Sequence, residues 1–186
     1  SKKWWHTPPV EYGAQILHKQ RFNKLDVILG GFYSGGDQFI KDTYDRYFRI
    51  NTGLRYRINN RLSIGINLLL NDGESQSYFL WQNKDAGAWI GDTNTLSNSR
   101  KLNYFIDPSI VYFDKFGNKH KLLGRINKAD NRNNANQSNS SNTYYGEYQL
   151  QREFSNIKLI TTAGITETFS NIEAALYSNQ IGRAHV

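Results

Sequence analysis

Side chains able to do catalytic or metal chemistry are sparse in this sequence. The 186 residues include no Cys, and no Ser-His-Asp set, nucleophile elbow or paired-carboxylate site can be assembled from them. Gly30-Gly31 and Gly35-Gly36 lack the strand-to-helix context of a phosphate-binding loop, and we expect them at a strand end and in a turn. We therefore expect no enzyme, no metal site and no cofactor. The four histidines share no metal-ligand spacing, and we expect them on the surface. They are His6, His18, His120 and His185.

Large aromatic side chains are concentrated in residues 71–101, between two strand-like segments. Tyr78, Phe79, Trp81 and Trp89 are too many for a disordered segment, so we expect a folded loop. Aromatic faces bind sugars, chelates and peptides alike. We predict that these four residues contact a solute, with packing inside the loop as the alternative.

The formal net charge of +7 raises the question of nucleic-acid binding. Arg49, Arg55 and Arg57 recur at even spacing, which places them on one side of an extended strand rather than in a continuous outer patch. We predict that they line the interior of a barrel and bind no nucleic acid. Glu147 and Glu153 are predicted to line the same interior and to pair with them, since unpaired charges are costly in a confined space.

The elements that would position these side chains are strands, because the sequence alternates with a period of two. Residues 44–59 place one set of apolar side chains on one side of an extended chain: Phe48, Ile50, Thr52, Leu54, Tyr56 and Ile58. The alternation resumes in residues 62–71 after Asn59-Asn60, a pair that tolerates the positive φ of a tight turn. A hairpin of two long strands is predicted.

Six further segments show the same period less cleanly, which gives eight candidate strands. Pro108 interrupts one of them and predicts a bulge or a poorly paired position. The six segments are residues 10–16, 25–29, 102–113, 121–127, 144–154 and 157–166.

Connection lengths are predicted to alternate between short and long. Short turns are expected near residues 20–24, 59–61, 114–119 and 155–156, and long loops near 34–43, 71–101 and 127–143. Residues 127–143 are rich in Asn and Ser, so we expect a mobile, water-exposed loop. Outer-membrane barrels sort their connections in this way, whereas a soluble sandwich or lipocalin-like barrel has no reason to.

The mean hydropathy of −0.67 does not exclude a membrane barrel, because such a barrel turns only every second residue toward lipid. No apolar run approaches the roughly 20 residues of a membrane-spanning helix. The predicted fold is all-β: an antiparallel up-and-down transmembrane β-barrel segment of about eight long strands, with short periplasmic turns and long extracellular loops.

Three short sequence segments resemble the barrel region of TonB-dependent receptors, which are active transporters of the bacterial outer membrane. They are Lys3-Trp4-Trp5-His6-Thr7-Pro8-Pro9 followed by Glu11-Tyr12-Gly13, Phe79-Leu80-Trp81-Gln82, and Tyr144-Tyr145-Gly146-Glu147-Tyr148-Gln149. The resemblance covers residues 1–180 and implies import of a metal chelate, glycan or peptide with energy from the inner membrane. It also implies outer-membrane lipid, a TonB complex reached through a plug domain, and a surface lipoprotein as partners.

The sequence contains no Met, which favours a truncated piece of a longer protein. Residues 181–186 match the translation of a common sequencing adapter, so we predict that they are not biological. Two alternatives to an importer fragment stay open at this point. One is a small, complete eight-stranded outer-membrane barrel with a structural or adhesive role; the other is a soluble sugar-binding β protein.

Overall fold

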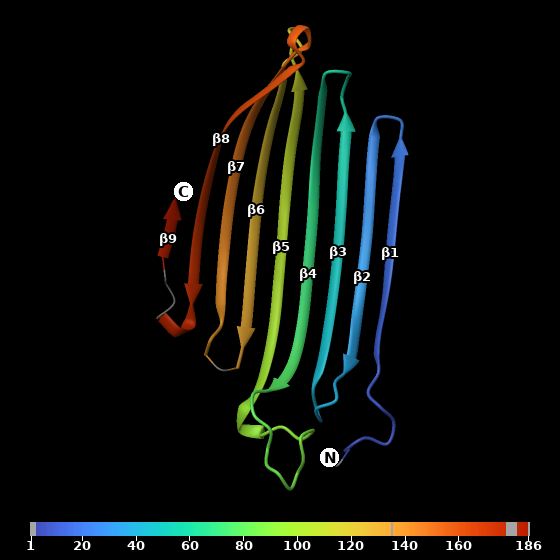
Figure 1. Ribbon diagram of the computed structural model, residues 1–186, viewed down its shortest axis with the longest axis vertical. Coiled ribbons are helices and arrows are strands. Elements are labelled where there is room, and N and C mark those ends of the chain that lie inside the picture. The colour runs from blue at the N-terminus through green and yellow to red at the C-terminus, as the bar shows by residue number, and fades with distance from the viewer. Residues whose placement is uncertain (1–2, 135, 178–181, 186) are drawn as a thin grey trace.

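A computed structural model of the chain forms one antiparallel sheet in which each strand pairs with the next along the sequence (Figure 1). The structure describes residues 3–134, 136–177 and 182–185. The up-and-down order and the all-β class are as predicted. The strands are β1 (Glu11–Phe22), β2 (Leu25–Asp37), β3 (Tyr44–Arg57), β4 (Leu62–Tyr78), β5 (Leu96–Phe113), β6 (Lys119–Asn133), β7 (Asn139–Phe154), β8 (Leu159–Ala174) and β9 (Gly182–His185).

The register of the sheet separates apolar from polar side chains, as the period of two predicts. Tyr56 of β3 lies opposite Ile64 of β4, which lies opposite Ile110 of β5. One residue along, Arg57 lies opposite Ser63 on the other side of the sheet. The side that carries Tyr56, Ile64 and Ile110 is called the apolar face below, and the side that carries Arg57 and Ser63 the polar face.

The sheet is a single curved layer (Figure 1). Among the described residues, Ala174 is the one buried apolar side chain. The accessible surface is 13441 Å², whereas a compact protein of this mass exposes about 9,200 Å². Since a stable sheet normally buries at least one face, the apolar face requires a covering that the described residues do not supply.

The two ends of the sheet differ in their connections. Residues 23–24, 58–61, 114–118 and 155–158 connect strands at one end, called the turn end. Residues 38–43, 79–95 and 134–138 connect them at the other, called the loop end. The contrast in length is smaller than predicted, because residues 79–95 form the one long connection among these.

The prediction of a mobile loop over residues 127–143 is wrong. β6 continues to Asn133 and β7 begins at Asn139, with ladder pairs as far as Asn131 and Asn139. The side-chain amide of Asn131 donates to Asn139 Oδ1 at 2.8 Å across the same pair. An Asn-rich segment can form strands here because its side chains need no core and its backbone is satisfied by the ladder.

Both predictions for the glycine pairs are wrong, since Gly30-Gly31 and Gly35-Gly36 lie inside β2. A Cβ atom at Gly30 would overlap the side chain of Asn51 directly opposite on β3. Glycine at position 30 therefore leaves room for the side chain of Asn51 and does not form a turn.

The hairpin between β3 and β4 turns where predicted but by another mechanism. Neither Asn59 nor Asn60 has a positive φ. Asn59 Oδ1 instead accepts hydrogen bonds from the backbone N–H groups of Arg61 at 2.8 Å and Leu62 at 2.9 Å, which is an Asx-type turn. The poorly paired position predicted at Pro108 is confirmed, because the β5–β6 ladder stops at Ile106 and resumes at Ser109.

No helix among the described residues is long and apolar enough to cross a membrane. Of the six residues assigned above to an adapter, Ile181 and Val186 lie outside the described residues. The other four form β9, which pairs with residues 169–172 of β8.

Candidate functional site

The loop of residues 79–95 is held against the N-terminal segment by an aromatic cluster. The ring of Trp89 lies 5.5 Å from that of Trp5 and 5.8 Å from that of Phe39, measured between ring centroids. Trp4 Nε1 donates a hydrogen bond to the carbonyl of Phe39 at 2.7 Å, and the backbone N–H of Lys41 donates to Trp89 O at 2.8 Å. Trp89, one of the four predicted solute contacts, therefore packs in this cluster, and its contact with a solute stays a prediction.

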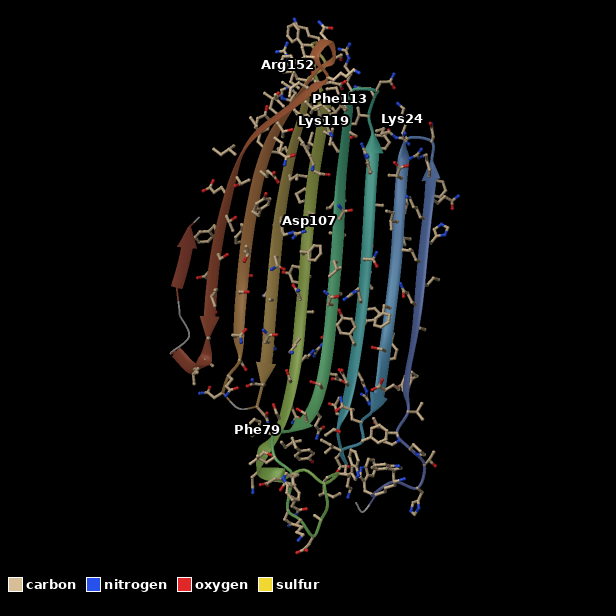
Figure 2. All side chains as sticks on the ribbon, in the orientation of Figure 1. Lys24, Phe79, Asp107, Phe113, Lys119 and Arg152 are labelled. Carbon is tan, nitrogen blue, oxygen red and sulfur yellow. The ribbon has the colours of Figure 1, made fainter. Side chains whose placement is uncertain are left out.

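The other three predicted solute contacts lie near one another at the start of the loop. Tyr78 ends β4 and packs its ring against Gly91, where a Cβ atom would overlap it. Phe79 is 86% exposed and Trp81 is 54% exposed, and Trp81 forms an isolated bridge with Gly91. Figure 2 shows Phe79 at the loop end of the sheet. Phe79 and Trp81 are thus the two predicted contacts with apolar surface free for a solute, and their role stays a prediction.

Arg49, Arg55 and Arg57 lie on the polar face, where the sequence predicts them. Arg49 Nε donates to Asn71 Oδ1 at 2.7 Å. Arg55 Nη2 donates to Ser63 Oγ at 3.4 Å. Arg57 Nη2 donates to the Asn23 carbonyl at 3.3 Å. Most of these partners are neutral, so the positive charge of the face is only partly compensated.

The predicted pairing of these arginines with Glu147 and Glu153 is wrong. Both glutamates lie on the polar face of β7, and three strands, β4 to β6, lie between β7 and β3. Glu147 instead accepts hydrogen bonds from Tyr145 OH, at 2.6 Å, and from the side chain of Gln149. Glu153 lies opposite Ile160 of β8.

The carboxylates that do pair on the polar face are Asp26 and Asp107, which sequence analysis did not single out. Asp26 pairs with Arg21 across the β1–β2 turn and with Arg57 at 3.4 Å. Asp107 accepts two hydrogen bonds from Arg125, at 2.6 and 2.7 Å, beside the gap in the β5–β6 ladder. The first pair could be found from the sequence, because Arg21 and Asp26 flank a two-residue turn; the second requires the register.

Asp114 organises the turn between β5 and β6. It accepts hydrogen bonds from the backbone N–H groups of Phe116, at 2.8 Å, and Asn118, at 2.9 Å. Burial alone would raise the pKa of this carboxyl, but hydrogen bonds from Asn118, Phe116 and His120 lower the pKa to about 2. His120, expected as a surface residue, is half-buried and lies 2.7 Å from Tyr148 OH.

Aromatic side chains of β3 and β5 define two rows on the apolar face, to which β4 contributes none at the positions opposite them. Phe48 and Tyr56 of β3 are eight positions apart, as are Tyr104 and Tyr112 of β5. Eight residues of strand rise about 27 Å, or about 21 Å along the axis of a barrel whose strands tilt by about 40°. On that geometry the belt between the rows is about 4 Å shorter than the hydrocarbon band of a membrane barrel, which is about 25 Å tall.

The belt between the rows is aliphatic and exposed. Between them, β3, β4 and β5 present no charged side chain to the apolar face. On β4, the first charged side chain toward the loop end is Asp72, which lies opposite Phe48 and pairs with Arg100 at 2.8 Å. On the apolar face of the three strands, the exposed apolar residues are Phe48, Ile50, Leu54, Tyr56, Ile64, Leu68, Ile110 and Tyr112.

Comparison with protein-family models, with curated proteins and with solved structures finds no match for this chain. Within residues 3–134, 136–177 and 182–185, no group of three His, Asp or Glu side chains could hold a metal ion. The function is therefore argued from the two faces of the sheet and the loop at its end.

Proposed function

We propose that this chain forms part of the wall of an outer-membrane β-barrel of the TonB-dependent receptor type, which imports a scarce solute with energy supplied from the inner membrane. The observation that carries the proposal is the exposed aliphatic belt between two aromatic rows, with a polar, charged face behind it. Lipid on the belt and water on the polar face would satisfy both sides of this single layer.

Lipid explains the apolar face better than a second layer of protein does. Aromatic side chains are enriched where a membrane meets water, and here Phe48 and Tyr56 bound the belt at both edges. A spanning strand needs about 9–11 residues, and the segment from Phe48 to Tyr56 meets the lower limit. A covering sheet would give no reason for aromatic residues at two fixed heights.

Import, rather than anchoring alone, is supported by the loop end. Phe79 and Trp81 expose apolar rings at the loop end of the sheet, in a loop held in place by Trp5, Phe39 and Trp89. In this proposal the rings contact a metal chelate, glycan or peptide before it enters the barrel. A plug domain, the TonB complex and a surface lipoprotein would then be its partners.

Cysteine labelling tests the membrane assignment directly, because the chain has no cysteine of its own. Leu54 and Arg55 are adjacent on β3 but lie on opposite faces. In outer membranes, a water-soluble maleimide should label Arg55→Cys and spare Leu54→Cys. A fluorophore at Leu54→Cys should be quenched by nitroxide lipids, and one at Arg55→Cys should not. Equal aqueous labelling of both positions would reject the proposal.

Uptake measurements test the transport assignment separately. Cells that express the complete receptor should accumulate the solute, and deletion of TonB should abolish this accumulation while the receptor stays in the membrane. Uptake that persists without TonB would assign the barrel to another class.

A smaller closed barrel with a structural role is less well supported. It would require β1 to pair with a strand at the far side of the sheet, whereas the described residues pair β1 with β2 alone. In a larger barrel, additional strands would pair with the free edge of β1.

A further inference from the structure

Cationic side chains crowd the turn end of the polar face, far from the aromatic loop. Figure 2 shows Lys24, Phe113 and Lys119 at this end and Phe79 at the other. Two adjoining cavities, of about 980 and 900 Å³, share Arg55 and Ser63 in their walls. Their walls contain one acidic residue, Asp107, and seven cationic ones: Lys24, Arg55, Arg57, Arg61, Lys119, Lys121 and Arg125.

Only two of these cations have an acidic partner among the described residues. Arg125 is held by Asp107, and Arg57 shares Asp26 with Arg21. The remaining five form no ion pair in the described part of the chain, and the hydrogen bond from Arg55 to Ser63 is long at 3.4 Å. Most of the charge in this region is therefore uncompensated.

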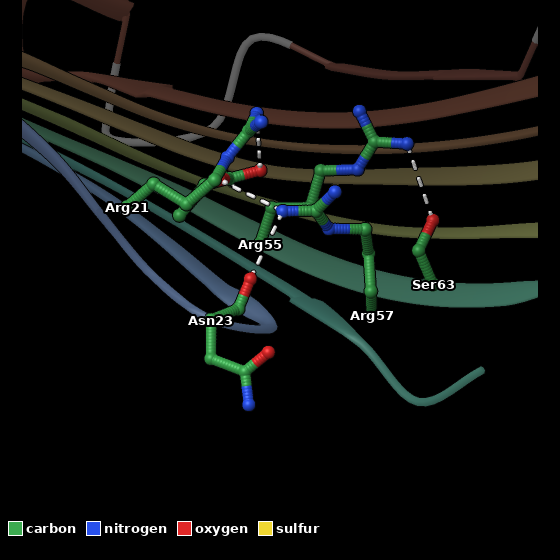
Figure 3. Close-up of polar contacts among 6 residues, drawn as sticks. Arg21, Asn23, Arg55, Arg57 and Ser63 are labelled. Carbon is green, nitrogen blue, oxygen red and sulfur yellow. Dashed lines mark hydrogen bonds and ion pairs between the residues drawn. The ribbon is translucent and has the colours of Figure 1, made fainter. Parts of the chain in front are cut away.

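One donor in the cluster is buried and has no acceptor. Arg57 Nε is shielded from water and makes no hydrogen bond within the described residues. The other end of the same guanidinium reaches Asn23 and Asp26, as Figure 3 shows beside Arg55 and Ser63. The Arg57 side chain is 38% exposed, so a ligand oxygen could reach the accessible part of this guanidinium but not the shielded Nε.

Small residues form the floor between the cationic side chains. Gly65 lies opposite Arg55 on one side and Ser109 on the other. A Cβ atom at Gly65 would lie 2.8 Å from Ser109 Oγ, so a larger residue would clash. From β3 to β6 the floor spans about 14 Å, which is three strand spacings. Arg55 and Lys121 can therefore reach toward each other over an open space.

We propose that this cluster binds a soluble polyanion that carries at least two phosphate or carboxylate groups. A concave surface lined by one sign of charge concentrates counter-ions, and guanidinium groups bind such oxyanions in a bidentate manner. Cavities of this volume are typical of small-molecule sites, which favours a solute over a polypeptide segment. The inference needs the sheet and its register, but it does not rest on the transport assignment.

Calorimetric titration of the full-length protein in detergent micelles tests the inference. Tripolyphosphate and citrate are the two probes, and they separate phosphate from carboxylate recognition. Arg55→Gln and Lys121→Gln should each weaken binding about tenfold, the loss of one charge-assisted contact. Lys101→Gln is the matched control, because Lys101 lies on the same face but outside both cavities. Binding should also weaken as salt is raised from low to physiological concentration.

Three results would overturn the inference. The first is no binding of either probe by the unaltered protein. The second is an equal loss in Lys101→Gln and Lys121→Gln, which would indicate attraction to net charge alone. The third is a lower melting temperature of Lys121→Gln without ligand, combined with no probe binding, which would indicate that an acidic segment covers the cluster. None of these results alters the cysteine-labelling test of the membrane assignment.

Discussion

Replacing Leu68 by Arg should destabilise the inserted sheet, whereas the same replacement at Leu69 should not. The two leucines are neighbours on β4 and project to opposite faces. Leu68 lies opposite Thr52 on the apolar face and is 37% exposed, and Leu69 lies opposite Asn51 on the polar face. The two variants therefore compare the same replacement on the face proposed to contact lipid and on the face proposed to contact water.

The expected magnitude follows from the position of Leu68 between the aromatic rows. Its partner Thr52 is midway between Phe48 and Tyr56, so Leu68 would lie at the centre of the bilayer. Arginine facing lipid at that depth costs about 2–4 kcal/mol, and the cost falls to about 0–1 kcal/mol near the interface. Ile64, opposite Tyr56, would lie at the interface. An arginine at Leu69 would extend into water and cost below about 1 kcal/mol.

Equilibrium unfolding by guanidinium in phosphatidylcholine vesicles, followed by tryptophan fluorescence, measures these differences in the complete barrel. The expected order of destabilisation is Leu68→Arg well above Ile64→Arg and Leu69→Arg. Equal costs for Leu68→Arg and Ile64→Arg would indicate a uniform protein covering of the apolar face instead of lipid. Equal costs for Leu68→Arg and Leu69→Arg would contradict the division into two faces.

Three further predictions concern the turn, the sheet and the loop. Asp114→Asn should lower stability above about pH 4 and have a much smaller effect near pH 2, because the stabilising charge is lost as pH falls through the folded pKa of about 2; urea unfolding at both pH values checks this. Gly30→Ala should cost about 1–3 kcal/mol through overlap with Asn51, and Asn51→Gly should recover most of that loss in the double mutant. Trp81→Ala should reduce solute uptake and leave loop proteolysis unchanged, whereas Trp89→Ala should make the loop of residues 79–95 cleavable.

The two faces of the sheet could be predicted from the sequence because the alternation of apolar and polar residues can be read within each strand separately. In β3, apolar side chains such as Leu54 and Tyr56 occupy every second position and Arg55 lies between them, a pattern that is visible without knowing the partner strand. The all-β class and the order of strands followed from that local signal and from short connections. The location of Arg55 on the polar face was predicted for the same reason.

Strand ends and side-chain partners could not be predicted, because they depend on register and on neighbouring strands. The Asn-rich residues 139–143 have no apolar period, yet they belong to β7 because β6 and β8 satisfy their backbone. Arg125 finds Asp107 only after β5 and β6 are aligned past Pro108. Likewise, Trp89 packs against Trp5, and no local sequence pattern indicates that these two distant segments are in contact.

The open edge of β1 connects the fold to the proposed barrel. β1 runs for 12 residues and pairs on one side only, with β2. In an antiparallel strand about half of the residues point both backbone groups to one side, so about 12 N–H and C=O groups lack strand partners along this edge. Each such group costs several kcal/mol in hydrocarbon, and together they exceed the 5–15 kcal/mol that stabilises a typical domain. A sheet whose apolar belt faces lipid therefore requires further strands at β1, and closure of the barrel is a condition of membrane insertion rather than an addition to it.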